Sequence, residues 1–219
     1  MKKKYKLLLH ETTTILDHKL YRIQALRDFG NVKKGDLGGY VGCARNLSQT
    51  GDAWIGDNAK VFGRALVCDN ALVIENAIVQ GDAIIKNNAK IADCSMVFGK
   101  SVIKDYATLY DFASVGNSIV CEHARLYDNM QIENTVIRRC DDVLYIRGLG
   151  DGHSITVFND NDKVTVIWKD YKGDLEGLDK RIRQSLEIPI DQFQKLTEMI
   201  EVYFKRGLST ESRSSEEIS

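Results

Sequence analysis

The chain has 219 residues, of which 43% are apolar, and its formal net charge is −1. A chain of this length and apolar content fills a hydrophobic core in one or two domains. A net charge close to zero gives no electrostatic reason to bind nucleic acid or a membrane surface, so we expect neither partner.

The cysteines and the N-terminal segment both indicate a cytoplasmic protein. The five cysteines, at positions 43, 68, 94, 121 and 140, lack the close pairs of a metal site and are interpreted as reduced thiols. In the lysine-rich start, only three leucines precede His10, which is too short a run for the core of a signal peptide. No later apolar run approaches the roughly 18 residues of a membrane span. We expect no metal and no cofactor.

The first 52 residues precede any regular repeat. Residues 20–26 have the composition of a strand, and a glycine-rich run follows at 35–41.

From Ala53 to Val115, an aliphatic residue recurs every six positions, with a small residue two positions ahead of it. The aliphatic set is Ile55, Val61, Val67, Val73, Val79, Ile85, Ile91, Val97, Ile103, Leu109 and Val115, and the small set is Ala53, Ala59, Ala65, Ala71, Ala77, Ala83, Ala89, Ser95, Ser101, Ala107 and Ala113. Neither a helix, with its period of about 3.6, nor an alternating strand gives this spacing. Short strands joined by tight corners do, and three such sides close a coil of about 18 residues whose strands pair at roughly 4.8 Å.

Turn-prone residues stand between these strands. The corner pairs are Asp57-Asn58, Gly63-Arg64, Asp69-Asn70, Glu75-Asn76, Gly81-Asp82, Asn87-Asn88 and Asp93-Cys94. Asn, Asp and Gly tolerate a positive φ, so the pattern predicts one left-handed residue at each corner. After Val115 the phase slips by one residue, which predicts a shortened corner near Gly116-Asn117.

The repeat resembles that of hexapeptide-repeat left-handed β-helix proteins, in which a small residue follows an aliphatic one by four positions. Ile55 to Lys60 and Val67 to Leu72 fit this motif, and the resemblance covers roughly Ala53 to Ile137. It implies the left-handed sense of the coil, which spacing alone does not give. The expected fold is mainly β, with an N-terminal β cap (1–52), a single-stranded left-handed parallel β-helix (53–140), a small α+β C-terminal domain (141–208) and a disordered tail (209–219).

A second resemblance concerns the N-terminal cap. An open β-helix end exposes unpaired backbone and core side chains, so we expect residues 1–52 to cover it. The segment Tyr21 to Phe29, the run Gly35 to Tyr40, Asn46-Leu47-Ser48 and Trp54 together are similar to uncharacterised phage and prophage β-helix proteins. That resemblance implies the cytoplasm of the host cell but no assigned chemistry.

The period of six ends after Arg138-Arg139-Cys140. Residues 143–147, 154–158 and 163–169 predict antiparallel strands. Asp174 is expected to cap a helix with Leu175, Leu178, Ile182 and Leu186 on one face, and a second helix from about Pro189 carries Ile190, Phe193, Leu196, Ile200 and Tyr203, with Gly207 as its stop. The serine- and glutamate-rich tail is expected to be disordered.

Outward-facing residues, stacked every eighteenth position, predict two apolar ladders. One contains Leu66, Ile84, Val102 and, after the slip, Ile119, and the other contains Phe62, Ile78, Met96 and Phe98. Solvated faces rarely carry such ladders, so we expect the C-terminal helices or another subunit to cover at least one. Because proteins of the resembled fold are usually trimers, we predict a homotrimer.

Two groups of residues are candidates for chemistry. Hexapeptide β-helices include acyltransferases with a histidine general base, and His123 is the coil histidine that this resemblance nominates. We interpret it as a solvated corner residue, because no inserted loop builds a substrate cleft. The segment 148–153 offers the backbone amides of Gly148, Gly150 and Gly152 and the His153 side chain to an anion, with Arg138, Arg139 and Arg147 adding charge. A plain hairpin connection is the alternative, and the acidic cluster at 159–162 is interpreted as a turn.

These observations favour a non-catalytic, trimeric, phage-type binding protein that sequesters a small anionic, nucleotide-like host-defence signal. A hexapeptide-class acyltransferase that uses acyl-CoA is one alternative. A structural or assembly scaffold is the other.

Overall fold

The structure is a computed structural model that describes residues 3–149, 153–160, 163–185 and 189–211. The chain divides into two compact units, Met1–Arg139 and Cys140–Ser219. Each unit buries its own set of apolar side chains.

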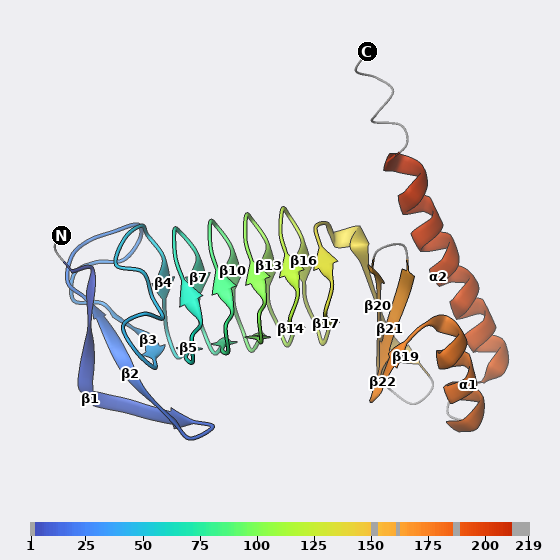
Figure 1. Cartoon of the computed structure of the whole chain (residues 1–219), viewed down its shortest axis with the longest axis horizontal. Helices are drawn as coiled ribbons and strands as arrows, with labels where there is room; N and C mark the ends of the chain where they lie inside the picture. Colours follow the sequence, from blue (N-terminus) through green and yellow to red (C-terminus); the bar gives the residue numbers. More distant parts are fainter. Residues whose placement is uncertain (1–2, 150–152, 161–162, 186–188, 212–219) are drawn as a thin grey trace, which may run out of the picture. The chain divides into compact units, whose positions relative to one another are not determined.

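A parallel β-helix forms most of the first unit, with one sheet along each of its three sides (Figure 1). Sheet 1 contains β5(Lys60–Val61), β8(Ile78–Val79), β11(Met96–Phe98), β14(Ser114–Gly116) and β17(Gln131–Glu133). Sheet 2 contains β6(Leu66–Val67), β9(Ile84–Ile85), β12(Val102–Ile103), β15(Ile119–Val120) and β18(Val136–Ile137). Sheet 3 contains β4(Trp54–Ile55), β7(Leu72–Val73), β10(Lys90–Ile91), β13(Thr108–Leu109) and β16(Arg125–Leu126).

The six-residue pattern sets which side chains fill the coils. Every member of the aliphatic set from Ile55 to Val115 is at most 1% exposed, and so is every member of the small set. Each coil therefore buries three aliphatic side chains, and the small residues lie where the walls converge. The predicted parallel β-helix is confirmed.

Each corner turns through one left-handed residue, as predicted. These residues are Asp57, Asp69, Glu75, Asn87, Asp93, Asp105, Asp111, Asn117, Glu122, Asp128 and Asn134, with φ from 48° to 61°, and Gly63, Gly81 and Gly99, with φ from 66° to 74°. Asn, Asp and Gly dominate the set because they tolerate this conformation best.

Acidic side chains also bond successive coils together at the corner between sheets 3 and 1. The carboxylates of Asp57, Glu75, Asp93 and Asp111 each accept a hydrogen bond from the backbone N–H of the corner residue one coil later, at 2.6 to 3.0 Å. The backbone amide of Asp111 is the main cause that holds the pKa of Asp93 below its usual value. This use of the acidic residues was not predicted.

Two corners are one residue shorter than those before them, and the second is at Asn134, because Ile119 pairs with Val136. Phe98 pairs with Gly116, whereas Val102 pairs with Ile119, so the step in sequence between paired residues falls by one. The first missing residue therefore lies between Gly116 and Ile119, at the corner formed by Asn117. The predicted shortened corner is confirmed.

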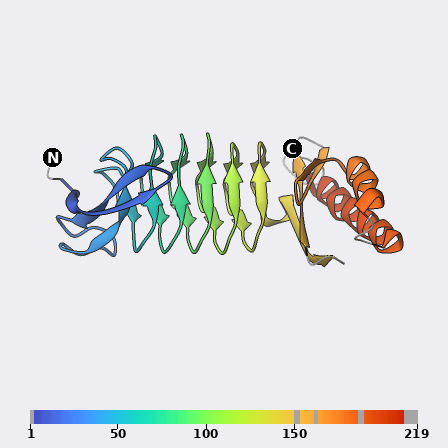
Figure 2. The ribbon, with the colours of Figure 1, turned by 90° about the horizontal axis from the view of Figure 1, so that it is seen from below.

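An N-terminal hairpin caps one end of the β-helix (Figure 2). β1(Tyr5–Ile15) pairs antiparallel with β2(His18–Ala25), which pairs antiparallel with β3(Leu37–Val41). β3 pairs parallel with β5, so sheet 1 runs on from the cap into the coils. The predicted β cap is confirmed, although its first strand was missed because its three consecutive leucines do not alternate with polar residues.

A buried lysine joins the cap to the first coil. The Nζ of Lys4 donates hydrogen bonds to the carbonyl oxygens of Ala53 (2.8 Å), Gly51 (3.3 Å) and Thr50 (3.4 Å). Lys4 is fully buried, and this burial, together with the nearby charge of Arg27, lowers its pKa to about 8. The three carbonyls compensate part of the cost of burying the ammonium group.

The second unit begins with the short 3-10 helix Cys140–Asp142 and an antiparallel sheet. Its strands are β19(Val143–Leu149), β20(His153–Asp160), β21(Lys163–Trp168) and β22(Tyr171–Gly173), in that order. The first three strands were predicted. The short strand β22 was not, because it has too few residues to show alternation.

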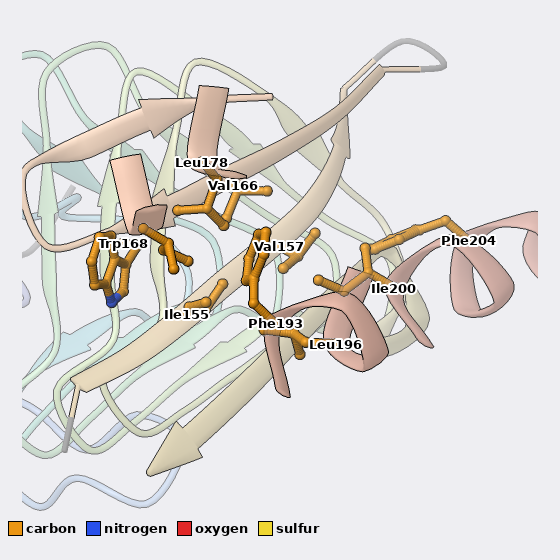
Figure 3. Close-up of a cluster of buried hydrophobic side chains, with 10 residues drawn as sticks. Ile155, Val157, Val166, Trp168, Leu178, Phe193, Leu196, Ile200 and Phe204 are labelled. Atoms are coloured by element: carbon orange, nitrogen blue, oxygen red, sulfur yellow. The ribbon is translucent and has the colours of Figure 1, made fainter. Parts of the chain in front are cut away.

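Two helices, α1(Leu175–Ser185) and α2(Ile190–Glu211), supply the rest of this core (Figure 3). The buried cluster contains Ile155, Val157, Val166, Trp168, Leu178, Ile182, Phe193, Leu196, Ile200 and Phe204. The Asp174 carboxylate accepts a hydrogen bond from the N–H of Gly177 at 2.8 Å, which confirms the predicted N-cap. In the described ranges, neither helix has the length and apolar character that a membrane span needs.

Helix α2 is longer than predicted. It continues through Gly207, which was expected to stop it, and ends at Glu211. A glycine costs about 1 kcal/mol inside a helix, which neighbouring turns can outweigh. Residues 209–211, expected in the disordered tail, are therefore helical. Leu186 and residues 212–219 lie outside the described residues.

Candidate functional site

The proposed anion site is divided between the two units. Arg138 and Arg139 end the last coil of the first unit, whereas Arg147 and Gly148 belong to β19 of the second. The candidate residues therefore belong to two separate structural units. Gly150 and Gly152 lie outside the described residues, as does the side chain of His153.

Arg138 extends a column of outward side chains on sheet 2. The pairing of Val120 with Ile137 places it next to Cys121, and the same register places Lys104 and Lys86 on the preceding coils. Its side chain is 59% exposed, and its Nε lies 4.0 Å from the Glu122 carboxylate. The column therefore offers cations along one edge of sheet 2.

Acidic residues at the adjacent corner balance these cations. The Nζ of Lys104 lies 3.4 Å from the carboxylate of Asp105, and Glu122 is similarly placed near Arg138. An anion that binds Arg138 replaces the exposed ion pair between Arg138 and Glu122 by its own contact with the guanidinium group. Such exposed pairs contribute at most about 1 kcal/mol, so the exchange costs little.

In the second unit, Arg147 and Gly148 lie near the end of β19, at an irregularity in its pairing with β20 between Ile146 and Leu149. Leu149 pairs with His153, so the segment 148–153 connects two antiparallel strands and no helix follows it. Gly148 has a φ of 72°, in the left-handed region, and a Cβ there would meet nothing within 4 Å. The backbone conformation, and not the available space, favours glycine at this position.

His123 is an exposed corner residue, as interpreted from the sequence. Its ring stacks on that of Tyr106, with the centres 5.2 Å apart and the planes at 9°. The carboxylate of its neighbour Glu122 lies 4.0 Å from the Nε of Arg138.

The apolar ladder on sheet 2 has the predicted register. Leu66, Ile84, Val102 and Ile119 occupy paired positions on successive coils, and Val136 extends the ladder by one coil. Ile84 and Ile119 are 36% and 38% exposed. The ladder is continuous from β6 to β18, along the whole sheet.

The second predicted ladder, on sheet 1, is broken. Ile78 and Met96 are paired, but Phe98 pairs with Gly116 in a neighbouring column. Phe62 is only 3% exposed, and its ring lies 5.0 Å from that of His18 in the cap. The chain's own hairpin therefore covers Phe62.

The described residues contain no group of three or more His, Cys, Asp or Glu side chains placed to hold a metal ion. Cys68 and Cys121 follow β6 and β15, which are three coils apart in sheet 2, whereas Cys94 lies at another corner. Of the predicted turn at 159–162, Asn159 and Asp160 belong to β20, and residues 161–162 lie outside the described residues.

Sequence reasoning missed a group of aromatic residues on sheet 3. Tyr106 stacks on His123, and Tyr110 stacks on Tyr127, with ring centres 5.7 Å apart and planes at 16°. In both pairs the two rings stand one coil apart, and a shortened coil joins them. That common separation was the signal that could have revealed them.

No protein-family model matches the chain, and no curated protein matches it in sequence.

Proposed function

We propose that this protein is a non-catalytic, phage-type β-helix trimer that binds a small anionic molecule, such as a nucleotide signal of host defence. The observation that carries the proposal is the uninterrupted run of coils. From β4 to β18, paired strands are separated in sequence by one regular or one shortened coil, so no inserted loop adds catalytic side chains. A rigid scaffold of this kind suits binding better than chemistry.

The trimer is supported by the sheet 2 ladder. Its aliphatic side chains stand at coil spacing on one sheet, and two of them are more than one-third exposed. A second copy of the chain carries the same spacing, so the two surfaces match coil by coil. Burying the ladder removes apolar surface from water and stabilises the contact.

The anionic ligand is supported by three exposed arginines, Arg138, Arg139 and Arg147. A guanidinium group binds phosphate through two parallel hydrogen bonds, which lysine does not do. In a trimer each arginine is present three times, so the assembly offers three times as many contacts to anions as one subunit does. The nucleotide and phage parts of the proposal rest on the sequence resemblance.

Calorimetric titration with AMP and with a cyclic dinucleotide tests this function. We expect binding of at least one, weakening as salt is added, and a loss of about tenfold or more when Arg138, Arg139 or Arg147 is replaced by alanine. The matched control is Arg64→Ala, which removes an exposed arginine paired with Asp82 on the first coils. It should leave the affinity unchanged.

Unchanged affinity in all three arginine variants would reject the site. The same titration with acetyl-CoA addresses the acyltransferase alternative. Binding of acetyl-CoA that depends on His123, with no binding of either nucleotide, would replace the proposed function by that alternative.

A further inference from the structure

Exposed aromatic side chains gather on the last two coils of sheet 3, around β13 and β16, which face the viewer in Figure 1. Tyr106, Phe112 and Tyr127 are 58%, 62% and 37% exposed. The two stacked pairs bring in His123 and Tyr110. These five side chains are called the aromatic patch below.

The fold does not require these rings, because neighbouring coils build the same positions without them. The equivalent residues are Asn88 and Ala92, one coil before Tyr106 and Tyr110, and Asn129, one coil after Phe112. Small or polar side chains thus form the same corners and the same strand surface. Exposed rings add little to folding beyond their stacking on one another, so their concentration on two coils indicates a binding surface.

Charges in and around the patch nearly cancel. Arg125 lies on β16 between the two stacked pairs, and Asp111 and Asp128 lie at the adjacent corner. At the opposite corner, Asp105 and Glu122 each lie within 4.0 Å of a cation. The carboxylates disfavour a polyanion, and Arg125 disfavours an organic cation, so a neutral ligand fits best.

We propose that the aromatic patch binds a neutral oligosaccharide. The C–H groups of a sugar ring pack against the electron-rich face of an aromatic ring. Its hydroxyl groups both donate and accept hydrogen bonds, which suits the tyrosine hydroxyls, Arg125 and the corner carboxylates. Two aromatic stacks on either side of Arg125 match a ligand that repeats its ring. This site is independent of the anion site proposed at Arg138.

Saturation-transfer NMR with maltohexaose, cellohexaose and chitohexaose tests the proposal on the full chain. We expect transfer from the protein to at least one of them. The triple variant Tyr106→Asn, Tyr110→Ala, Phe112→Asn carries the side chains of neighbouring coils, so it should keep its circular dichroism spectrum and melting temperature. Its affinity for that sugar should fall about tenfold or more.

Met96→Ser is the matched control. It removes a 36% exposed apolar side chain from sheet 1 and inserts the residue found one coil later, at Ser114. Sugar affinity should not change in this variant.

Three results would overturn the inference: no transfer to any of the three sugars, equal affinity in the folded triple variant, or loss of AMP binding in that variant. The last would assign the rings to the anion site. If only the Arg138→Ala variant loses AMP binding, that result bears on the proposed function and not on this inference. Failure of AMP to bind at all, with sugar binding intact, would reject the proposed function and leave this inference standing.

Discussion

At the scale of single residues, the buried ammonium of Lys4 links stability to pH. Its pKa is about 8 in the folded chain and 10.5 as a free side chain. Between these values the unfolded chain binds more protons, so the free energy of unfolding should rise as the pH increases from 8 to 10. Below pH 8 the lysine is charged in both states, and the full cost of burying it remains.

Urea denaturation at a series of pH values measures this rise, and Lys4→Met should remove it. Measurements stop at pH 10 because burial raises the pKa of Tyr5 to about 12, which lowers stability as the pH rises above 10. An equal slope in the wild type and in Lys4→Met would show that Lys4 is not the group responsible.

Asp93 has two functions at its corner. Its backbone is left-handed, with a φ of 53°, and its carboxylate accepts a hydrogen bond from the N–H of Asp111 at 2.9 Å. Asn retains both an acceptor and tolerance of this φ, Gly retains only the tolerance, and Ala retains neither. Melting temperatures should therefore fall in the order wild type, Asp93→Asn, Asp93→Gly, Asp93→Ala.

Acid separates the two contributions of Asp93. Because its pKa is lowered in the folded chain, the advantage of Asp over Asn is present above pH 3.8 and is lost as the pH falls through the folded value. Melting curves at neutral and acidic pH measure this difference. A gap between Asp and Asn that persists in strong acid would contradict a role for the ionised carboxylate.

At the scale of elements, Gly116 lets the ring of Phe98 lie across β14. A Cβ at Gly116 would overlap that ring. Gly116→Ala should therefore destabilise the chain by roughly 1–3 kcal/mol, since the ring must move. Combined with Phe98→Ala, the loss should be smaller than the sum of the two single losses, because the clash is gone. Chemical denaturation of the four proteins measures this coupling, and strict additivity would argue against the contact.

Elements with a period were predictable from the sequence, and elements that depend on distant partners were not. The coils were predicted because every sixth residue from Ile55 onward repeats one physical role. Strand β1 has no such local signal, and it exists because it pairs with β2. Gly207 shows the reverse case. It is a local signal for the end of a helix, but α2 continues through it.

The candidate site was only partly predictable for the same reason. The sheet 2 ladder follows from coil spacing, so Leu66, Ile84, Val102 and Ile119 were found. Phe62 is covered by a hairpin much earlier in the chain, through His18. The repeat gives no information about this contact. The aromatic stacks were not predicted, because the six-residue pattern describes the buried side chains, whereas the rings occupy outward positions at which the preceding coil has Asn88 and Ala92.

At the scale of the whole molecule, the predicted trimer depends on the sheet 2 ladder. Ile119→Lys places a charge on it and should convert a trimer into a monomer, because an unpaired charge is costly at an apolar contact. Leu72→Lys is the matched control, since Leu72 is 37% exposed on sheet 3 and Ile119 is 38% exposed on sheet 2. Light scattering measures the mass of the assembly. A trimer that survives Ile119→Lys but not Leu72→Lys would show that the subunits meet on sheet 3 and not on sheet 2.

Native mass spectrometry of freshly purified protein tests the central claim most directly, because it reports the number of subunits and any bound molecule together. We predict a trimer that carries extra mass, which disappears on denaturation and corresponds to a small anion. A trimer without bound mass would still agree with an assembly scaffold, which filament growth or a co-purifying partner would support. A monomer without bound mass would contradict the account.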